Sequence, residues 1–529
     1  MKKYYFALFI FFILIYVMPN LMLGILPQEA QAATQAYCAY KYEAFTLSNL
    51  DNIISGFFIS LFGFTKWGIA SNGIIALAVL SLSTIYAIKK CTNDNTLAAF
   101  TYLLFFSSFW IFLFIPDAVV GNSGIWGALI NFLGLGAYFM ASREERFSFQ
   151  RIGLLLLCGI LTFASLLISG LNPFFFSIIV ATLYMLSQKR YIDMLLMPIE
   201  IIIVTGALLS LSSYCGQGNF FAWVCDGKVS ILNYWTEFFS DIPKAQDTII
   251  NNLMLLGMGI LPIAPFLLCS IRNYKKTSVE FLRRPIYKFS MIFLLTAIIF
   301  SILNRGLIMA NLPITYLPFS FLVATGLVTY LRSNNRHKLL SSCFVLIGVI
   351  AVLLGTNLLL LDNNYFLSGV ILIIIGLMLI FTVKLNIEKR IAVYFFSLSL
   401  FMLIAALQIS FMADKYFPTA RQINKRIETI VGKNYPDNQV QFFACSLNNY
   451  HLINFHLQNK VELINDEMAN KITDNKRVIS SAKFAELLKN NHREFIVFSD
   501  SSATKATEFE WLKQAKIMQF DNFTIYYFE

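Results

Sequence analysis

Long, almost uncharged apolar stretches recur through the first 412 residues of this 529-residue chain. A helix needs about 20 consecutive apolar residues to cross the hydrocarbon core of a bilayer. The composition agrees: charged residues make up 13% of the chain, against about a quarter in a soluble domain, and the mean hydropathy is +0.65. The sequence therefore predicts a polytopic α-helical membrane protein and excludes a disordered chain or a secreted disulfide scaffold.

The apolar stretches predict thirteen membrane-spanning helices. The first resembles a secretory signal followed by Ala30-Gln31-Ala32, but it is longer than a usual signal core, so we expect it to remain uncleaved. The apolar segment 53–64 is too short to cross and is predicted to be an interfacial helix on the outer leaflet. The predicted spans are 5–25, 67–88, 96–115, 122–141, 152–169, 174–187, 192–213, 249–270, 287–303, 316–331, 339–361, 365–383 and 391–412.

Lys and Arg are concentrated at alternate ends of these spans, and the opposite ends are nearly bare of them. This is the positive-inside pattern, so the clustered side is predicted to be cytoplasmic, as in a bacterial inner membrane. With an odd number of spans, the N-terminus is cytoplasmic and the C-terminus periplasmic. The net charge of +11 follows from these clusters, so we expect no nucleic-acid partner. The clusters are Lys2-Lys3, Lys89-Lys90, 143–151, Lys189-Arg190, 272–288, 332–338 and 384–390.

The composition becomes polar after Met412, which predicts two domains: a transmembrane domain at 1–412 and a small extracytoplasmic α/β domain at 413–529. Five segments of the second domain, rich in β-branched and aromatic residues, predict strands. These are VQFFAC (440–445), NFHLQ (454–458), KVELI (460–464), EFIVFS (494–499) and FTIYYF (523–528). Segments 415–432, 480–490 and 507–516 predict helices.

The cysteines and histidines give little sign of a metal centre. Cys215 and Cys225 share one predicted outer loop, where a disulfide is compatible with an oxidising compartment and two buried thiols are the alternative. The sequence has no CxxC motif, and its four His lack the spacing of metal ligands. We therefore assign no structural metal site.

Several motifs occupy the ends of the predicted spans. Pro27-Gln28-Glu29 opens the first outer loop, FFISLFGFTKWG with Gly63 leads into the second span, and Asp117 precedes the fourth. The segment NRGLIMANLPITYLPF (304–319) contains two Leu-Pro pairs, and LINFHLQNKVELIND (452–466) lies in the tail. Together these segments resemble bacterial membrane glycosyltransferases of the GT-C class, in particular the lipid A aminoarabinose transferases and their protein-mannosyltransferase relatives.

The resemblance implies a GT-C-like fold and transfer of a sugar from a polyprenyl-phosphate donor to lipid A or another cell-envelope glycan. The membrane lipids, the donor and a lipid or glycan acceptor are the implied partners. The chain departs from the family pattern at several positions. Gln28 stands where the family has Asp, the Lys-Pro-Pro after the first loop helix is absent, the Arg entering the second span is lost at Ala70-Ser71-Asn72, and Asn311 replaces a Lys.

The implied chemistry explains which residue types are needed. The leaving phosphate requires cationic side chains or a divalent metal cation. A hydroxyl acceptor requires a carboxylate base, whereas a phosphate acceptor is already anionic. On the matched motifs we expect Asp117 and Glu29 to be catalytic, Asp117 orienting the acceptor or a cation and Glu29 giving electrostatic support. Arg305 is expected to bind the donor phosphate. The residues expected to contact substrate are Gln28, Arg305, Asn311 and Tyr316.

Three other functions remain open. The same chemistry could deliver the sugar to protein hydroxyls, as in a protein O-glycosyltransferase. The chain could be a catalytically inactive relative that binds a lipid-linked sugar, which Gln28 favours. A transporter should place ionisable residues within its spans, and Asp193 and Glu200 are the clearest examples here. Because the acidic residues on the matched motifs lie outside the spans, an enzyme is favoured.

Overall fold

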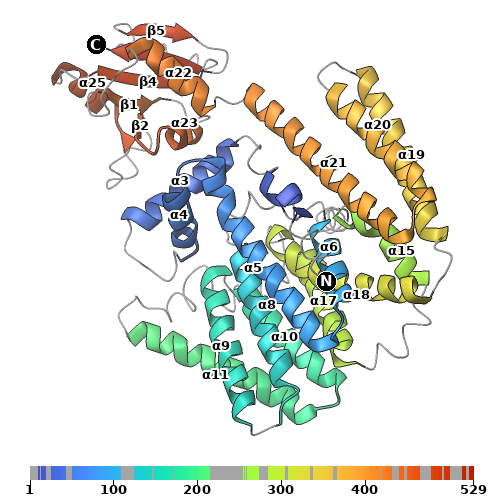
Figure 1. Cartoon of the computed structure of the whole chain (residues 1–529). Helices are drawn as coiled ribbons and strands as arrows, with labels where there is room; N and C mark the ends of the chain where they lie inside the picture. Colours follow the sequence, from blue (N-terminus) through green and yellow to red (C-terminus); the bar gives the residue numbers. More distant parts are fainter. Residues whose placement is uncertain are drawn as a thin grey trace. The chain divides into compact units, whose positions relative to one another are not determined.

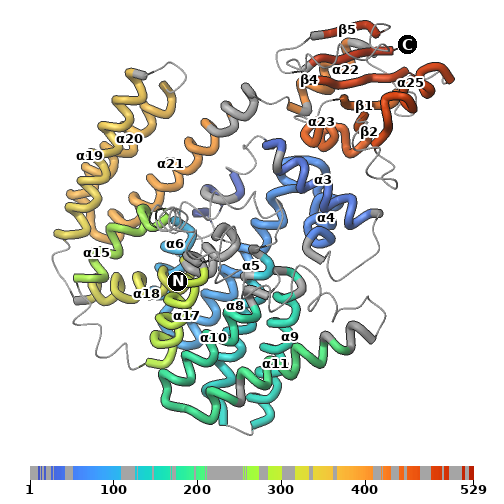
Figure 2. Tube along the Cα trace, turned by 180° about the vertical axis from the view of Figure 1, so that it is seen from behind, coloured from blue at the N-terminus to red at the C-terminus, as the bar shows by residue number. Residues whose placement is uncertain are grey.

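The computed structural model divides the chain into two compact units (Figures 1 and 2). Unit one comprises Met1–Pro19, Phe45–Asp51 and Asn72–Ala405, and unit two comprises Asn20–Ala44, Asn52–Ser71 and Ala406–Glu529. The structure describes residues 10–11, 13–18, 25–42, 50–108, 124–145, 148–169, 171–214, 254, 257, 259–272, 284–303, 308–333, 338–361, 366–416, 419–431, 440–445, 450–464, 478–490, 494–500, 515–519 and 523–528.

Unit one is an assembly of apolar helices. Its described elements are the π-helix η1 (Ile13–Val17), most of α5 (Lys66–Thr92), α6 (Asn95–Phe106), α8 (Gly124–Ala141), α9 (Phe149–Ser169), α10 (Leu171–Ser187), α11 (Tyr191–Tyr214), η4 (Leu261–Ile263), α15 (Ala264–Arg272), α17 (Pro285–Leu303), α18 (Ile308–Ser333), α19 (Lys338–Leu361), α20 (Phe366–Phe381), η6 (Thr382–Lys384) and most of α21 (Ile387–Tyr416).

Among the described residues, six helices are long and apolar enough to cross a membrane: α5, α9, α11, α19, α20 and α21. Others, such as α8, α10 and α17, are apolar but shorter within the described residues. The long helices expose many large apolar side chains, including Leu346 and Leu353 of α19 and Phe381 of α20. Such exposure suits contact with lipid and would be unfavourable in water. The chain is therefore a multi-pass membrane protein, and the count of thirteen spans stays a prediction.

Aromatic packing joins the helices in the middle of unit one. Phe176 of α10 meets Phe293 of α17 edge-to-face at 5.2 Å between ring centroids, and Tyr184 meets Phe289 at the same separation. Tyr138 of α8 is fully buried and donates a hydrogen bond to the Ala181 carbonyl of α10 at 3.1 Å. Helices α8, α10 and α17 therefore share one hydrophobic core, held by specific ring contacts and a hydrogen bond.

Helices α19 and α20 form a tight antiparallel pair that depends on glycine. A Cβ atom added to Gly348 would lie 2.7 Å from the Gly376 carbonyl oxygen, and one added to Gly355 would lie 2.7 Å from that of Gly369. Small residues at a membrane helix interface allow the backbones to approach closely. The seven-residue spacing of these glycines on each helix keeps them on one face.

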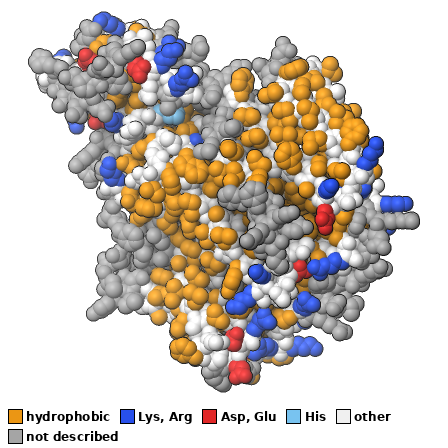
Figure 3. Space-filling model, in the orientation of Figure 1, with side chains coloured by type: hydrophobic (Ala, Val, Ile, Leu, Met, Phe, Trp, Pro, Cys, Tyr) orange, Lys and Arg blue, Asp and Glu red, His pale blue; other side chains and the backbone are white. Residues whose placement is uncertain are grey.

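The membrane-facing character of unit one is visible on its surface (Figure 3). Hydrophobic side chains cover most of the helical surface in this view, and blue Lys and Arg side chains gather along its lower edge. Lys89 and Lys90 end α5, Arg332 lies in the last turn of α18, and Lys384 ends η6. These described basic residues therefore lie at helix ends, which agrees with a polar boundary flanking an apolar band.

Unit two is built on a six-stranded sheet. Its strands are β1 (Val440–Ala444), β2 (Val461–Ile464), β3 (Val478–Ile479), β4 (Glu494–Asp500), β5 (Lys516–Gln519) and β6 (Phe523–Phe528), in the order β3-β2-β1-β4-β6-β5. The first four run parallel, and β6 and β5 are antiparallel additions. Its other elements are α3 (Pro27–Tyr42), α4 (Leu50–Phe62), α22 (Ala420–Val431), α23 (Tyr450–His456) and α25 (Ser481–Asn490).

The two faces of this sheet have separate cores. Ile423 and Ile427 of α22 and Ile453 of α23 pack with Ile496 and neighbouring strand residues on one face. Phe484 of α25 lies in the core on the other face. Alternate strand residues point to opposite faces, so both sets of side chains are buried, as expected of a mostly parallel sheet.

Most elements predicted in the tail are confirmed. Strands β1, β2, β4 and β6 and helices α22 and α25 match the predicted segments. The strand predicted at 454–458 is wrong, because these residues belong to α23 and the turn after it. Every residue from Leu452 to Phe455 is buried, and a short buried run does not distinguish a strand from a short helix by its periodicity. The helix predicted at 507–516 lies outside the described residues except for its last two positions, where β5 begins at Lys516.

Candidate functional site

The structure describes some of the sequence-predicted site residues and not others. Asp117, Arg305, Cys215 and Cys225 lie outside the described residues. Gln28 is the second residue of α3 and Asn311 lies in the first turn of α18, and only their backbones are described. The two predicted residues with described side chains are Glu29, in unit two, and Tyr316, in unit one.

Glu29 stabilises the beginning of α3. The helix starts at Pro27, whose fixed φ and missing N–H suit the first helical position. Two residues later, Glu29 Oε2 accepts a hydrogen bond from the backbone N–H of Leu26, the residue before the helix, at 3.0 Å. This is the reach of a capping-box carboxylate back to the N-cap N–H, and it places negative charge at the positive end of the helix.

The same carboxylate binds Lys66, which the sequence analysis did not select. Lys66 Nζ lies 2.7 Å from both Oε1 and Oε2 of Glu29. The two side chains are only 8% and 5% exposed. A lysine at the first position of a helix is disfavoured by the helix dipole, and a buried charge requires a partner. The Glu29 carboxylate offsets both effects, because it gives the buried lysine an anionic partner at hydrogen-bond distance.

A specific turn brings Lys66 to this position. Gly63 directly follows α4 and has a φ of +81°, a conformation that glycine adopts without strain. Thr65 then accepts a hydrogen bond through Oγ1 from the Gly68 N–H at 3.1 Å, which caps the start of α5. The Phe64 ring meets Tyr37 of α3 at 4.6 Å and Phe455 of α23 at 5.3 Å between centroids. The turn is thereby fixed to two other elements of unit two.

Helix α3 presents a small-residue face that lets its neighbours approach. Ala30, Ala33, Ala36 and Ala39 are all buried. A Cβ on Gly56 of α4 would lie 2.2 Å from the Ala36 carbonyl oxygen, so only glycine fits there. From the tail, Asn459, just after α23, donates a hydrogen bond to Cys38 Sγ at 3.4 Å. The loop helix that contains Gln28 and Glu29 is therefore packed between α4 and the α/β sheet domain.

Tyr316 is buried in unit one, with 1% exposure, and its hydroxyl faces the Ser108 hydroxyl. Ser108 lies just after Ser107, the C-cap of α6. Leu317 and Pro318, the second Leu-Pro pair, are also buried. The Leu-Pro motif of α18 therefore lies close to the end of α6.

A second polar contact lies in the stretch Ala70-Ser71-Asn72, where the sequence departs from the pattern it resembles. Asn72 of α5 is fully buried, and its Oδ1 accepts a hydrogen bond from Trp126 Nε1 of α8 at 2.5 Å. Deeper in α8, Asn131 accepts a hydrogen bond from Ser177 of α10. The Asn72 amide therefore joins α5 to α8 within unit one.

These arrangements define what the described residues can do. Both oxygens of Glu29 have donors, so the carboxylate holds two helix starts together with its charge compensated by Lys66. Within the described part of the chain, no group of three or more His, Cys, Asp or Glu is placed to hold a metal ion. The contacts favour a positioning role for Glu29 over proton transfer, and its assignment as catalytic stays a prediction.

Comparison with known proteins identifies the fold. No family model matches the chain, and no curated protein matches it. The crystal structure of ArnT from Cupriavidus metallidurans bound to undecaprenyl phosphate matches with a TM-score of 0.66 at 13% identity, over 99% of this chain and 97% of that one. Its apo structure matches with a TM-score of 0.65 at 14% identity, over 97% and 96%.

The match extends over nearly the full length of both chains, so it includes the membrane helices, the loop helices and the α/β tail alike. The matched structure is an ArnT that binds undecaprenyl phosphate, a polyprenyl phosphate. At 13% identity the likeness is one of fold. The chain thus has the fold of ArnT, and the resemblance inferred from its motifs is confirmed at the level of the fold.

Proposed function

We propose that this chain is an integral-membrane glycosyltransferase that transfers a sugar from a polyprenyl-phosphate donor to lipid A or another cell-envelope glycan. The observation that carries the proposal is the fold likeness to ArnT bound to undecaprenyl phosphate over 99% of the chain. The position of the motifs supports it, because the loop helix α3, the entry to α5 and the Leu-Pro segment of α18 belong to the same fold.

The reaction breaks the bond between the anomeric carbon and the phosphate oxygen of the donor, while an acceptor oxygen forms a new bond to that carbon. The leaving phosphate gains negative charge and requires a cation, a role we assign to Arg305. Asp117 orients the acceptor or a cation, and Gln28, Asn311 and Tyr316 contact the substrates. An acceptor that is itself a phosphate needs no general base, which fits glutamine at position 28.

In this proposal the Glu29–Lys66 pair positions the substrate-binding loop. Gln28 precedes Glu29 in α3, and consecutive helical residues project about 100° apart, since about 3.6 residues make one turn. Glu29 is held by Lys66 and by the Leu26 N–H, which fixes the beginning of α3, where Gln28 is the second residue. Glu29 acts on the substrate through Gln28 and through its field.

The proposed membrane placement follows the charge pattern. The N-terminus lies in the cytoplasm, and the domain at 413–529 lies in the periplasm of a bacterial inner membrane, with a Cys215–Cys225 disulfide in one outer loop. Reporter fusions after residues 90, 190 and 412 test the placement: phosphatase activity at either of the first two, or its absence at the third, contradicts it. Two free thiols in native-membrane protein, found by non-reducing mass spectrometry, contradict the disulfide.

Sugar transfer by charge-removing variants tests the catalytic assignment. Asp117→Asn should lower the rate of transfer from a polyprenyl-phosphate sugar by about 100-fold or more if Asp117 is a main catalytic group. Gln28→Ala should lower it much less. Glu486→Gln removes an exposed carboxylate in α25 and serves as the matched control. Wild-type rates in both Asp117→Asn and Glu29→Gln, at equal expression, would refute the assignment of both residues.

One observation favours a second function. Gln28 stands where the family has Asp, and the neighbouring Glu29 is fully engaged by Lys66 and Leu26. A chain that keeps the fold while its first loop carboxylate is committed to structure would suit a catalytically inactive relative that binds lipid-linked sugars. Wild-type protein that binds a polyprenyl-phosphate sugar but transfers it to no acceptor would establish this alternative.

A further inference from the structure

Three helix ends meet at one end of unit one: the last turn of α5, the turn between α8 and α9, and the turn between α10 and α11. Arg190, in the third of these, donates a hydrogen bond to the carbonyl of Ser142, which directly follows α8, at 2.5 Å. The Tyr184 hydroxyl of α10 also lies against the Ser142 hydroxyl. Cys91, near the end of α5, packs on the core that α8 and α10 share. The three helix ends therefore form one continuous surface.

Basic side chains from all three helix ends gather on this surface. The Arg143 guanidinium lies against the Cys91 thiol, and Lys90 is close to the same thiol. Arg143 and Arg190 are both close to the Tyr184 hydroxyl. Among the described residues, no Asp or Glu acts on either the thiol or this hydroxyl. Three separate segments of the sequence therefore bring positive charge to one place.

The neighbours of these cations do not neutralise them. Arg143 is exposed, and the thiol beside it is a weak hydrogen-bond partner without charge. Lys90 is also exposed, and its Nζ lies 6.0 Å from the centroid of the uncharged Tyr86 ring. Both side chains therefore keep a full positive charge that can act on a ligand.

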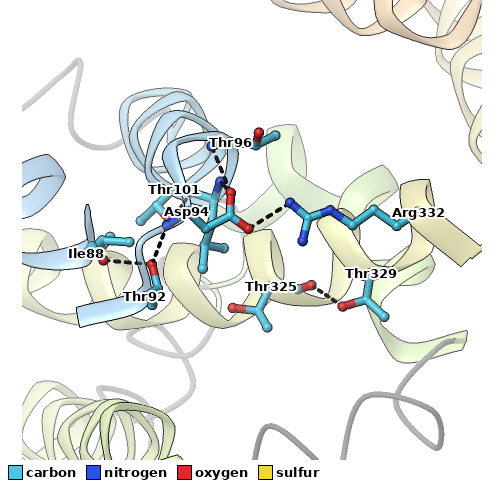
Figure 4. Close-up of polar contacts among 9 residues, drawn as sticks. Ile88, Thr92, Asp94, Thr96, Thr101, Thr325, Thr329 and Arg332 are labelled. Carbon is cyan, nitrogen blue, oxygen red and sulfur yellow. Dashed lines mark hydrogen bonds and ion pairs between the residues drawn. The ribbon is translucent and has the colours of Figure 1, made fainter. Parts of the chain in front are cut away.

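The nearby carboxylates are paired or outnumbered. Asp193 is 1% exposed and meets both Arg151 and Arg190, so it offsets the charge of only one of them. Asp94, just after α5, binds Arg332 of α18 at 2.8 Å (Figure 4). The described charged residues of the three helix ends are Lys89, Lys90, Arg143, Arg151, Lys189 and Arg190 against Glu144, Glu145 and Asp193. The surface therefore has a net positive charge.

Exposed apolar side chains follow this surface along the same helices. Leu183 of α10 is 42% exposed, and Leu82 and Tyr86 of α5 are 69% and 66% exposed. Each lies within eight residues of Lys90 or Arg190 in the sequence. Basic residues at the ends of membrane helices mark the level of the lipid headgroups. A lipid whose headgroup lies on the basic surface therefore has its acyl chains at the depth of these apolar side chains.

We propose that this surface binds the phosphodiester headgroup of an anionic phospholipid, with Arg143, Lys90 and Arg190 around the phosphate. Phosphatidylglycerol and cardiolipin both carry this group, and basic pockets between membrane helices suit such headgroups. The surplus of cations selects a lipid with a net negative charge. The ammonium of a zwitterionic lipid would instead face basic side chains, because Asp193 is buried in its own ion pairs. The bound lipid joins the end of α5 to the ends of α8 and α10.

Native mass spectrometry of the purified full-length chain tests the proposal. The protein is mixed with equal amounts of phosphatidylglycerol, phosphatidylcholine and phosphatidylethanolamine that carry the same acyl chains, and we expect phosphatidylglycerol to be retained most strongly. Arg143→Gln and Lys90→Gln should each lower the ratio of bound phosphatidylglycerol to phosphatidylcholine by about 3-fold or more, since each basic residue near an anionic lipid contributes a factor of about five. Arg143→Glu should lower the ratio further. A separate mixture with cardiolipin shows which anionic lipid the surface prefers.

Lys338→Gln and Lys384→Gln are the matched controls, because each removes one exposed basic residue at the end of another helix. Both should leave the lipid ratio unchanged. Excess inorganic phosphate should not displace the lipid, because it lacks acyl chains. The proposal would be overturned by equal retention of the three lipids, by an unchanged ratio in Arg143→Glu, by an equal fall in the controls, or by displacement with inorganic phosphate, which would assign the surface to a soluble anion.

Discussion

The two units contain buried ion pairs of different design. In unit two, Glu29 meets one cation, Lys66, with both side chains under 10% exposed. In unit one, Asp193 of α11 is 1% exposed and meets two cations: Arg151 of α9 at 3.2 Å and Arg190 at 2.9 Å. Each arrangement joins two helices, but only Asp193 has a second cationic partner.

The difference follows from where the pairs lie in the sequence. Arg151 and Arg190 belong to two of the basic clusters of the sequence, so cations are abundant near Asp193, and it pairs with two of them. Arg190 also donates a hydrogen bond to the Ser142 carbonyl at 2.5 Å, which ties it to the end of α8. Lys66 lies in a region nearly bare of Lys and Arg. A cation in such a region is expected to have a specific partner.

Replacement of Lys66 should give the largest loss of stability. Lys66→Met leaves the buried Glu29 carboxylate without its cation, and breaking a buried pair by removing one partner costs about 3–5 kcal/mol. Denaturant unfolding of the full chain in mixed micelles measures the loss. Glu29→Gln combined with Lys66→Met removes both charges and should recover much of the stability. A double variant that is less stable than Lys66→Met alone would contradict the coupling between them.

Replacement of Arg151 should cost less, because Arg190 still neutralises Asp193. We expect Arg151→Met to lower the free energy of unfolding by about 1–3 kcal/mol, the cost of lost hydrogen bonds to a charged group. Asp193→Asn should cost more than Arg151→Met, since it leaves two cations close together. The same unfolding measurement applies, and equal losses in Arg151→Met and Lys66→Met would show that the second cation provides no redundancy.

Acid should weaken unit two through α23. Burial lowers the pKa of His456 to about 4, below the value of about 6.5 for an unfolded chain. Between these values the unfolded chain binds more protons than the folded one, so stability falls as pH drops from 6.5 toward 4. We expect hydrogen exchange in α23 to indicate a loss of about 1 kcal/mol from pH 7.5 to 5.5. Burial also lowers the pKa of His451 in the same helix, so His456→Gln should reduce this dependence rather than abolish it, and an unchanged slope in that variant would assign it to another group.

The exposed pair between Arg332 of α18 and Asp94, the N-cap of α6, should contribute least. Arg332 is 64% exposed where it meets Asp94, and exposed ion pairs are worth about 0.2–1 kcal/mol. Arg332→Gln should therefore lower the free energy of unfolding by less than about 1 kcal/mol, with the same denaturant method and with Lys338→Gln as the control. A loss as large as that of Lys66→Met would mean that exposure does not distinguish these pairs.

The sequence predicted the elements better than the contacts. Alternating and β-branched residues located β1, β2, β4 and β6, but β3 has only two residues, too few to show a pattern. The prediction for 454–458 is wrong because α23 forms where its residues pack against the sheet. Asn454 is part of this contact, since its side chain accepts a hydrogen bond from the Val461 N–H of β2. Such contacts between distant segments are not encoded in local periodicity.

The Glu29–Lys66 contact was missed for the same reason, although one signal pointed to it. Lys66 follows a Gly-Phe-Thr turn at the start of a helix, where the helix dipole disfavours a cation. A lysine at such a position in a region nearly bare of basic residues indicates a carboxylate partner. The identity of that partner required the fold, because 37 residues separate the two side chains.

Mass spectrometry of lipid A and surface glycans tests the central claim most directly. Cells that lack the gene are compared with cells that express the wild-type chain or Asp117→Asn at equal levels. The account predicts that the wild type adds a sugar to lipid A or to another envelope glycan, and that this product is absent from the deletion strain and reduced about 100-fold or more with Asp117→Asn. Identical lipid A and glycan profiles in the deletion and wild-type strains would contradict the proposed transferase.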